Sequence, residues 1–182
     1  RILSTDIAAN RGIQVGNNGN IQIENSEIML SRAKGIRTGD GGSITIRDSQ
    51  LITNGIYMVE EGTTQRKLKR LEITNSTVVT SDVLGSTGNF TSVGEIVIHG
   101  SSIRQSEDYG NGYSIGCGDY GSFDRIDIQD SQIDIPRANY GAAIGGGKYT
   151  TDPGNSVIRI ANSRVFARTR DRRSTAIGRD IG

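Results

Sequence analysis

The chain has 182 residues, of which 34% are hydrophobic, and its formal net charge at pH 7 is +1. This length suits one domain, and a net charge so close to zero gives no long-range attraction to nucleic acid or to an anionic membrane surface. A single cysteine excludes an intramolecular disulfide framework and a cysteine-based zinc site. No run of 18 apolar residues is present, so we expect no membrane span.

One eight-residue phrase recurs six times along the chain. It reads aliphatic, any, aliphatic, any, then Asn, Asp or Gly, then Ser, any, and Ile, Val or Leu. Its copies are IQIENSEI (21–28), ITIRDSQL (44–51), LEITNSTV (71–78), IVIHGSSI (96–103), IDIQDSQI (126–133) and IRIANSRV (158–165). Repeats at intervals of this length indicate a solenoid, in which each repeat forms one coil.

Each copy predicts two short strands separated by a turn. Alternation over the IxI segment is the two-residue period of a strand with one buried face. The Asn, Asp or Gly that follows tolerates a left-handed backbone and turns the chain, and the serine and the later aliphatic residue re-enter the interior. Stacked coils would place the serines in one ladder and the Asn and Asp residues in another.

A second phrase, a small residue, then Ile, then Gly, predicts a third strand in each coil. In chain order, an incomplete leading coil contributes RGIQVG (11–16), and the later copies are KGIRTG (34–39), NGIYM (54–58), DVLG (82–85), YSIGCG (113–118), AAIGGG (142–147) and TAIGRD (175–180). We therefore expect an all-β fold, a right-handed parallel β-helix of six to seven coils with three short strands per coil.

The segments GAAIGGG (141–147) and GNSVIRIANSRVFA (154–167) resemble the Gly-rich right-handed parallel β-helix repeats of secreted bacterial surface and adhesin-like proteins. The resemblance covers residues 20–182 and is one of repeat style. It implies the same fold and a secreted or cell-surface setting, and it transfers no catalytic residue, since one fold serves many functions. Because the chain begins at Arg1 and ends within a repeat, we expect 1–182 to be a single β-helix domain from a longer protein.

The outward positions of the IxI strands form two mixed, charged columns. Flat rows of threonine, which an ice-binding solenoid needs, are absent from them. Neighbours such as Glu24 with Arg47, and Asp127 with Arg159, are expected to form cross-strand ion pairs. The function expected of these columns is structural.

A polysaccharide lyase or glycoside hydrolase on this fold would need convergent carboxylates. Asp124 and Asp127 are the only catalytic candidates, and they are weak ones in a chain with 20 acidic residues. His99 is the only histidine, so no His-rich metal site is expected. We expect no cofactor; a structural calcium ion in a Gly/Asp loop such as 39–42 is an alternative that lacks the ligand spacing of known calcium repeats.

Five of the six tyrosines lie between residues 109 and 149. Aligning IGCGDY with IGGGKY places Tyr120 over Tyr149, and Asp119 beside Lys148, on successive coils. Exposed rings suit the C–H faces of sugars, whereas rings packed over long loops would be structural. The candidate ligand-binding residues are Tyr109, Asp119, Tyr120, Tyr140, Lys148 and Tyr149.

These observations favour a non-catalytic extracellular module, an adhesin or stalk segment, that binds a glycan or a cell-surface protein through an exposed face. Two alternatives remain open. One is a fragment of a carbohydrate-active enzyme, and the other is a unit that associates end to end through open strand edges. No nucleic-acid partner is expected.

Overall fold

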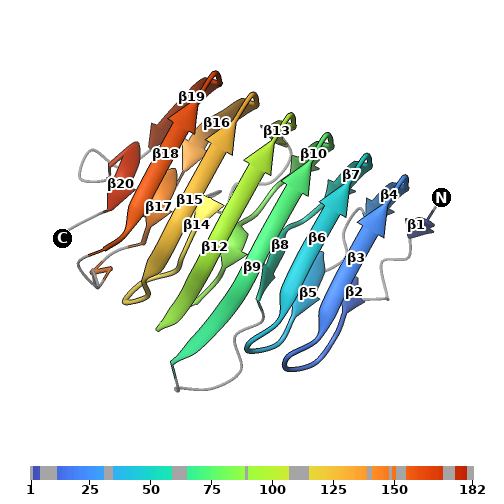
Figure 1. Cartoon of the computed structure of the whole chain (residues 1–182), viewed down its shortest axis with the longest axis horizontal. Helices are drawn as coiled ribbons and strands as arrows, with labels where there is room; N and C mark the ends of the chain where they lie inside the picture. The colour runs from blue at the N-terminus through green and yellow to red at the C-terminus, as the bar shows by residue number, and fades with distance from the viewer. Residues whose placement is uncertain are drawn as a thin grey trace.

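The chain folds into three parallel β-sheets wound around one axis, with three strands in each coil. The computed structural model describes residues 2–4, 12–30, 35–58, 65–88, 90–106, 115–138, 141–147, 149–150, 155–169 and 175–179. Figure 1 shows the strands in order along the axis, from β1 near the N-terminus to β20 near the C-terminus. The predicted all-β solenoid with three strands per coil is confirmed.

The three sheets take one strand each from every coil, in the cyclic order A, B, C. Sheet A contains β1 (Ile2–Ser4), β4 (Glu27–Leu30), β7 (Gln50–Thr53), β10 (Thr77–Thr80), β13 (Ser102–Gln105), β16 (Gln132–Ala138) and β19 (Arg164–Thr169). Sheet B contains β2 (Ile13–Gln14), β5 (Ile36–Thr38), β8 (Ile56–Met58), β11 (Leu84–Ser86), β14 (Ile115–Gly116), β17 (Ile144–Gly146) and β20 (Ile177–Arg179). Sheet C contains β3 (Asn20–Glu24), β6 (Ser43–Arg47), β9 (Arg66–Thr74), β12 (Thr91–His99), β15 (Phe123–Gln129) and β18 (Val157–Ala161). The IxI segments form sheet C, and the small-Ile-Gly segments form sheet B.

The core is a thin column of stacked aliphatic side chains. In sheet C, Ile96 and Ile98 point inward and are fully buried, and their neighbours on successive coils are again Ile or Leu in register. Sheet A adds residues such as Ile103, and sheet B adds Ile115, which is also fully buried. Burying each such side chain contributes about 1.5–3 kcal/mol to the stability of the fold. A narrow interior is therefore sufficient to stabilise the solenoid, because it repeats over many coils.

The turn from sheet C to sheet A uses a left-handed residue in every complete coil. The φ angles lie between 47° and 57° at Asn25, Asp48, Asn75, Gly100, Asp130 and Asn162. Asn and Asp accept this conformation more readily than other residues with a Cβ, and Gly accepts it freely. The turn predicted from residue type is therefore confirmed at all six positions.

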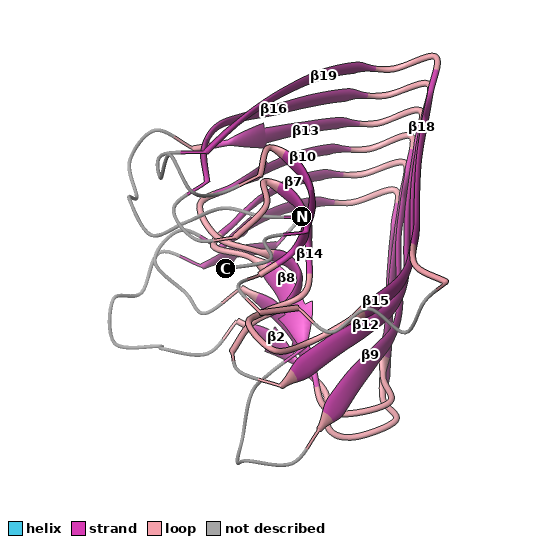
Figure 2. Cartoon of the chain, turned by 90° about the vertical axis from the view of Figure 1, so that its left-hand side faces the viewer, coloured by secondary structure: helices cyan, strands magenta, loops and turns pink. Residues whose placement is uncertain are grey.

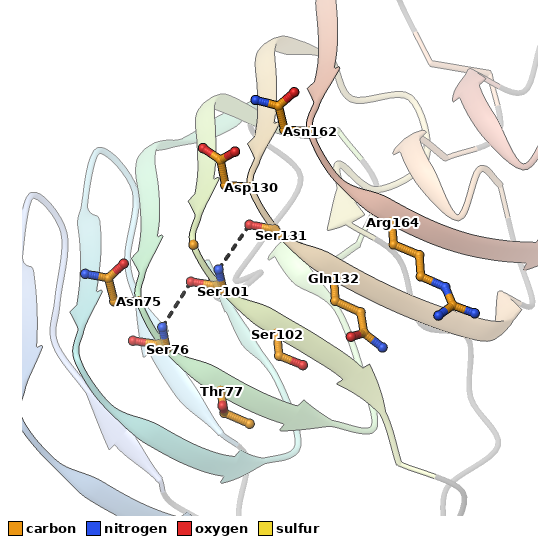
Figure 3. Close-up of a pocket in the computed structure, with 11 residues that line it drawn as sticks. Asn75, Ser76, Thr77, Ser101, Ser102, Asp130, Ser131, Gln132, Asn162 and Arg164 are labelled. Atoms are coloured by element: carbon orange, nitrogen blue, oxygen red, sulfur yellow. Dashed lines mark hydrogen bonds between the residues drawn. The ribbon is translucent and has the colours of Figure 1, made fainter.

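The serine after each turn forms a hydrogen-bonded ladder along the axis (Figure 3). The Ser76 N–H donates to Ser101 Oγ at 3.1 Å, and the Ser101 N–H donates to Ser131 Oγ at 3.1 Å. Each hydroxyl in turn donates to the carbonyl two residues earlier in its own coil, as Ser101 does to His99 at 2.8 Å. The ladder extends from Ser26 to Ser163, so these buried polar groups are satisfied in every coil.

The glycines of sheet B are required by close stacking of the backbone. Gly85, Gly116 and Gly145 have φ angles of 136°, 150° and 134°, a region that residues with a Cβ rarely adopt. A Cβ at Gly116 would lie 1.7 Å from the carbonyl oxygen of Gly145 on the next coil. This explains why the Ile-Gly dipeptide recurs in the C-terminal half of the chain.

Viewed toward one end of the stack, the three sheets form the sides of the solenoid's cross-section (Figure 2). The strands of sheets A and C meet at one corner, and the long strands β9, β12 and β15 extend toward sheet B at the other end of sheet C. Among the described residues, no helix is long and apolar enough to cross a membrane.

Candidate functional site

Three exposed aromatic residues form a strip at the corner where sheet B leads into sheet C. Phe90, Tyr120 and Tyr149 precede the sheet C strands of three successive coils, and their φ angles are 61°, 55° and 54°. Their exposed fractions are 42%, 40% and 53%, which is high for rings of this size. We call these three residues the aromatic strip.

The rings of the aromatic strip stack on one another along the solenoid axis. The Phe90 and Tyr120 centroids are 5.2 Å apart with planes at 23°, and the Tyr120 and Tyr149 centroids are 5.1 Å apart with planes at 19°. Carbon atoms in contact are about 3.5–4.0 Å apart, so the rings must be displaced sideways by roughly 3.5 Å. The rings therefore overlap only partly in an offset stack, and part of each ring stays exposed.

The left-handed backbone makes the strip an unusual place for aromatic residues. In the first coils the same turn carries Asn18 and Gly41, with φ angles of 55° and 70°. An ordinary side chain in this conformation costs about 1–2 kcal/mol, whereas an aromatic pair contributes about 0.5–1.5 kcal/mol beyond its buried area. Ring stacking by itself therefore does not exceed the cost of the left-handed backbone, which Asn or Gly adopts more readily.

A row of polar side chains lies beside the aromatic strip on the same outward face. Ser92 and Ser122 follow Phe90 and Tyr120 by two residues, and a buried residue separates each pair. The Ser122 N–H and hydroxyl both lie 3.1 Å from Ser92 Oγ. Lys67, on the preceding coil, lies in register with Ser92, so the row begins with a cationic side chain.

An ion pair crosses this surface over a glycine. Lys67 Nζ lies 2.7 Å from Asp124 Oδ2, although the two residues belong to coils that are not adjacent. Gly94 occupies the intervening coil, and a Cβ there would lie 3.4 Å from Lys67 Cε and 2.4 Å from the Lys69 carbonyl oxygen. The aromatic strip is thus bordered by two hydroxyls, an ammonium group and a carboxylate, which are groups that hydrogen-bond sugars.

The structure brings together part of the predicted ligand-binding set. Tyr120 stacks on Tyr149 on the next coil, as the alignment predicted. Asp119 precedes Tyr120, and its carbonyl oxygen accepts a 2.8 Å hydrogen bond from the Phe90 N–H. Tyr109, Tyr140 and Lys148 lie outside the described residues.

Phe90, Ser92 and Lys67 were not among the site residues predicted from the sequence. A signal for Phe90 was present, because NFTS (89–92), DYGS (119–122) and KYTT (148–151) share an aromatic residue followed by two small residues. Lys67 had no such signal, since its contact with Asp124 spans 57 residues of sequence.

The two catalytic candidates lie in ion pairs. Asp124 pairs with Lys67 as described, and Asp127 accepts hydrogen bonds from Arg125 and, at 3.3 Å, from Arg159. The hydrogen bond from Arg125 is the main cause that lowers the pKa of Asp127 below its ordinary value. A general acid needs a raised pKa, so the surroundings of Asp127 do not suit that role.

The outer face of sheet C carries a continuous network of charges. Arg47 lies 2.9 Å from Glu72 and 3.8 Å from Glu24, and Arg70 contacts both Glu72 and Glu95. The hydrogen bond from Arg47 is the first cause that lowers the pKa of Glu72. The cross-strand pairs predicted for Glu24 with Arg47 and for Asp127 with Arg159 are confirmed.

Cys117 is buried in the hydrophobic core. Burial is the main cause that raises the pKa of its thiol to about 11, so the thiol is neutral and unreactive at physiological pH. Within the described residues, no group of three or more His, Cys, Asp or Glu side chains could hold a metal ion.

Comparisons of this chain with protein-family models, with curated proteins and with solved structures found no match. The fold defines the chain as a β-solenoid. Because one fold can serve many functions, only the exposed surfaces of the chain can indicate its function.

Proposed function

We propose that this chain is a non-catalytic extracellular β-helix module, an adhesin or stalk segment, that binds glycans through the aromatic strip. The observation that carries the proposal is the stack of three exposed rings on left-handed turns. The extracellular setting comes from the resemblance in repeat style.

The chemistry of this surface favours a sugar. Partly exposed rings offer apolar area to the C–H faces of pyranoses, and the stacking holds them in one orientation before a ligand arrives. Ser92, Ser122, Lys67 and Asp124 supply donors and acceptors at the edge of the strip for ring hydroxyls. The rings follow the axis, so we expect an extended glycan to lie parallel to it.

The test compares glycan binding by the native chain with that of a variant carrying Phe90→Ala, Tyr120→Ala and Tyr149→Ala. A glycan array identifies the ligand, and calorimetry measures its affinity. Loss of two or more aromatic contacts, each contributing about 0.5–1.5 kcal/mol, should lower affinity by about tenfold or more. Tyr120→Phe with Tyr149→Phe keeps the rings and should retain most of the binding.

Phe166→Ala is the matched control, because Phe166 is an equally exposed aromatic residue (45%) on sheet A, outside the strip. It should leave glycan affinity unchanged. Unaltered affinity in the triple variant, with circular dichroism showing an intact fold, would refute the role of the strip. Binding of a cell-surface protein but of no glycan on the array would favour a protein partner instead.

A further inference from the structure

A second surface feature, independent of the aromatic strip, lies at the opposite end of sheet C. A shallow groove with a volume of ≈ 430 Å³ follows the corner between sheets C and A across four coils (Figure 3). One wall carries Asn75, Asp130 and Asn162, and the other carries Thr77, Ser102, Gln132 and Arg164. We call it the corner groove, and its volume is within the range of small-ligand sites.

The corner groove exists because one coil lacks a side chain at the turn. Five of the six left-handed turn residues are Asn or Asp, and the sixth is Gly100. A Cβ at Gly100 would lie 2.6 Å from Asn75 Oδ1, so a larger residue would occupy the space between Asn75 and Asp130. Asn would satisfy the turn equally well, and the gap is therefore not required by the backbone.

Most outward polar side chains around the corner groove are unpaired, although the Asn75 amide donates to Asp48 Oδ1 at 3.3 Å. In the described part of the chain, the side chains of Thr77, Ser102, Gln132, Asn162 and Arg164 make no hydrogen bond or ion pair with one another or with any other residue. The carboxylate of Asp130 lies 3.6 Å from His99 Nε2. By contrast, four arginines of sheet C are each paired with a carboxylate, namely Arg47, Arg70, Arg125 and Arg159.

These groups together match one ligand chemistry. Asn75, Asp130 and Asn162 offer acceptors on one wall, while the hydroxyls and the Gln132 amide offer donors on the other. Arg164 adds a free guanidinium at one end, which suits a planar carboxylate. The four coils repeat about every 4.8 Å, so the groove is long enough for several linked sugar rings.

We propose that the corner groove is a second binding site, for an acidic oligosaccharide that lies along the axis with a carboxylate against Arg164. The sugar hydroxyls bridge the two walls over Gly100. This site does not depend on the function proposed for the aromatic strip.

Gly100→Asn is the decisive variant. It restores at this coil the residue type that the turn carries in Asn25, Asn75 and Asn162, so the fold should tolerate it, and thermal unfolding verifies this. The probes are uronate-containing tetrasaccharides of hyaluronan, alginate and oligogalacturonate, each with its carboxyl-reduced counterpart, titrated by calorimetry. The native chain should bind at least one acidic probe, and Gly100→Asn should weaken that binding by about tenfold or more because it fills the groove.

Arg164→Gln tests the ligand class. It should remove the preference of the native chain for the acidic probe over its reduced form, while leaving binding of the reduced form unchanged. Failure of the native chain to bind any acidic probe, or equal binding by native and Gly100→Asn chains, overturns the proposal. The triple variant of the aromatic strip should retain this binding, so failure of either site is distinguishable from failure of the other.

Discussion

The same backbone conformation serves two purposes at the residue scale. At the corner of sheets C and A, left-handed residues are Asn, Asp and Gly, the types that adopt it at least cost. At the corner of sheets B and C, the last coils use Phe90, Tyr120 and Tyr149 instead. Residue type predicted the first set of turns, whereas the second set was visible only as an alignment of tyrosines, because aromatic residues carry no preference for a positive φ.

Gly116→Ala should be severely destabilising, by about 3 kcal/mol or more, since it combines a forbidden φ with a clash. The φ angle of Gly116 is 150°, and a Cβ there would lie 1.7 Å from the carbonyl oxygen of Gly145. Urea unfolding measures the change. Gly16→Ala is the control, because a Cβ at Gly16 meets nothing within 4 Å and should change stability by about 0.5 kcal/mol or less. Similar stabilities of the two variants would contradict the stacking explanation for the sheet B glycines.

At the element scale, the unit that repeats is the sheet C strand, the turn that follows it and the next sheet A strand. Its serine accepts a hydrogen bond from the coil before and donates one within its own coil, as Ser101 does with Ser76 and His99. The sequence predicted this ladder, since the serines recur at one place in the phrase. It could not predict the polarity of the ladder, because the direction of each N–H depends on how the coils pair.

Ser101→Ala should cost about 1–3 kcal/mol, because it leaves the buried Ser76 N–H without an acceptor. Ser102→Ala is the control, one residue further along on the outward face. It should change the free energy of unfolding by about 0.5 kcal/mol or less. Equal effects of the two substitutions on chemical denaturation would show that the ladder contributes nothing to stability.

At the scale of the whole molecule, the strands of each coil pair only with strands of the neighbouring coils, so stability should vary along the axis. Ile98 in β12 is fully buried, whereas Ile160, which lies in register in the outermost described strand of sheet C, is 36% exposed. The sheet A strands beside them, β13 and β19, differ in the same way, since β13 has a partner on each side and β19, among the described strands, pairs with β16 alone.

Native-state hydrogen exchange should therefore be slower in β12 and β13 than in β18 and β19, by roughly tenfold or more. Amide exchange followed by NMR or mass spectrometry measures the gradient. Uniform protection along the described coils would indicate that the solenoid unfolds as a single cooperative unit.

The sequence by itself determined the sheets, the coil repeat, the inward aliphatic columns and the left-handed turns at Asn and Asp. These features depend on the local hydrophobic period and on residue type, and both recur in every repeat of the sequence. It also aligned Tyr120 with Tyr149, since the flanking glycines fix their relative position.

Only the tertiary structure decided the stacking of Phe90 onto Tyr120, the reach of Lys67 to Asp124 and the groove over Gly100. Each of these depends on which side chains neighbouring coils place side by side. Loops of different lengths connect the strands, so the register of these side chains cannot be read from the number of residues between them. The surfaces to which function is assigned are therefore products of stacking, while the scaffold that carries them follows from the repeat.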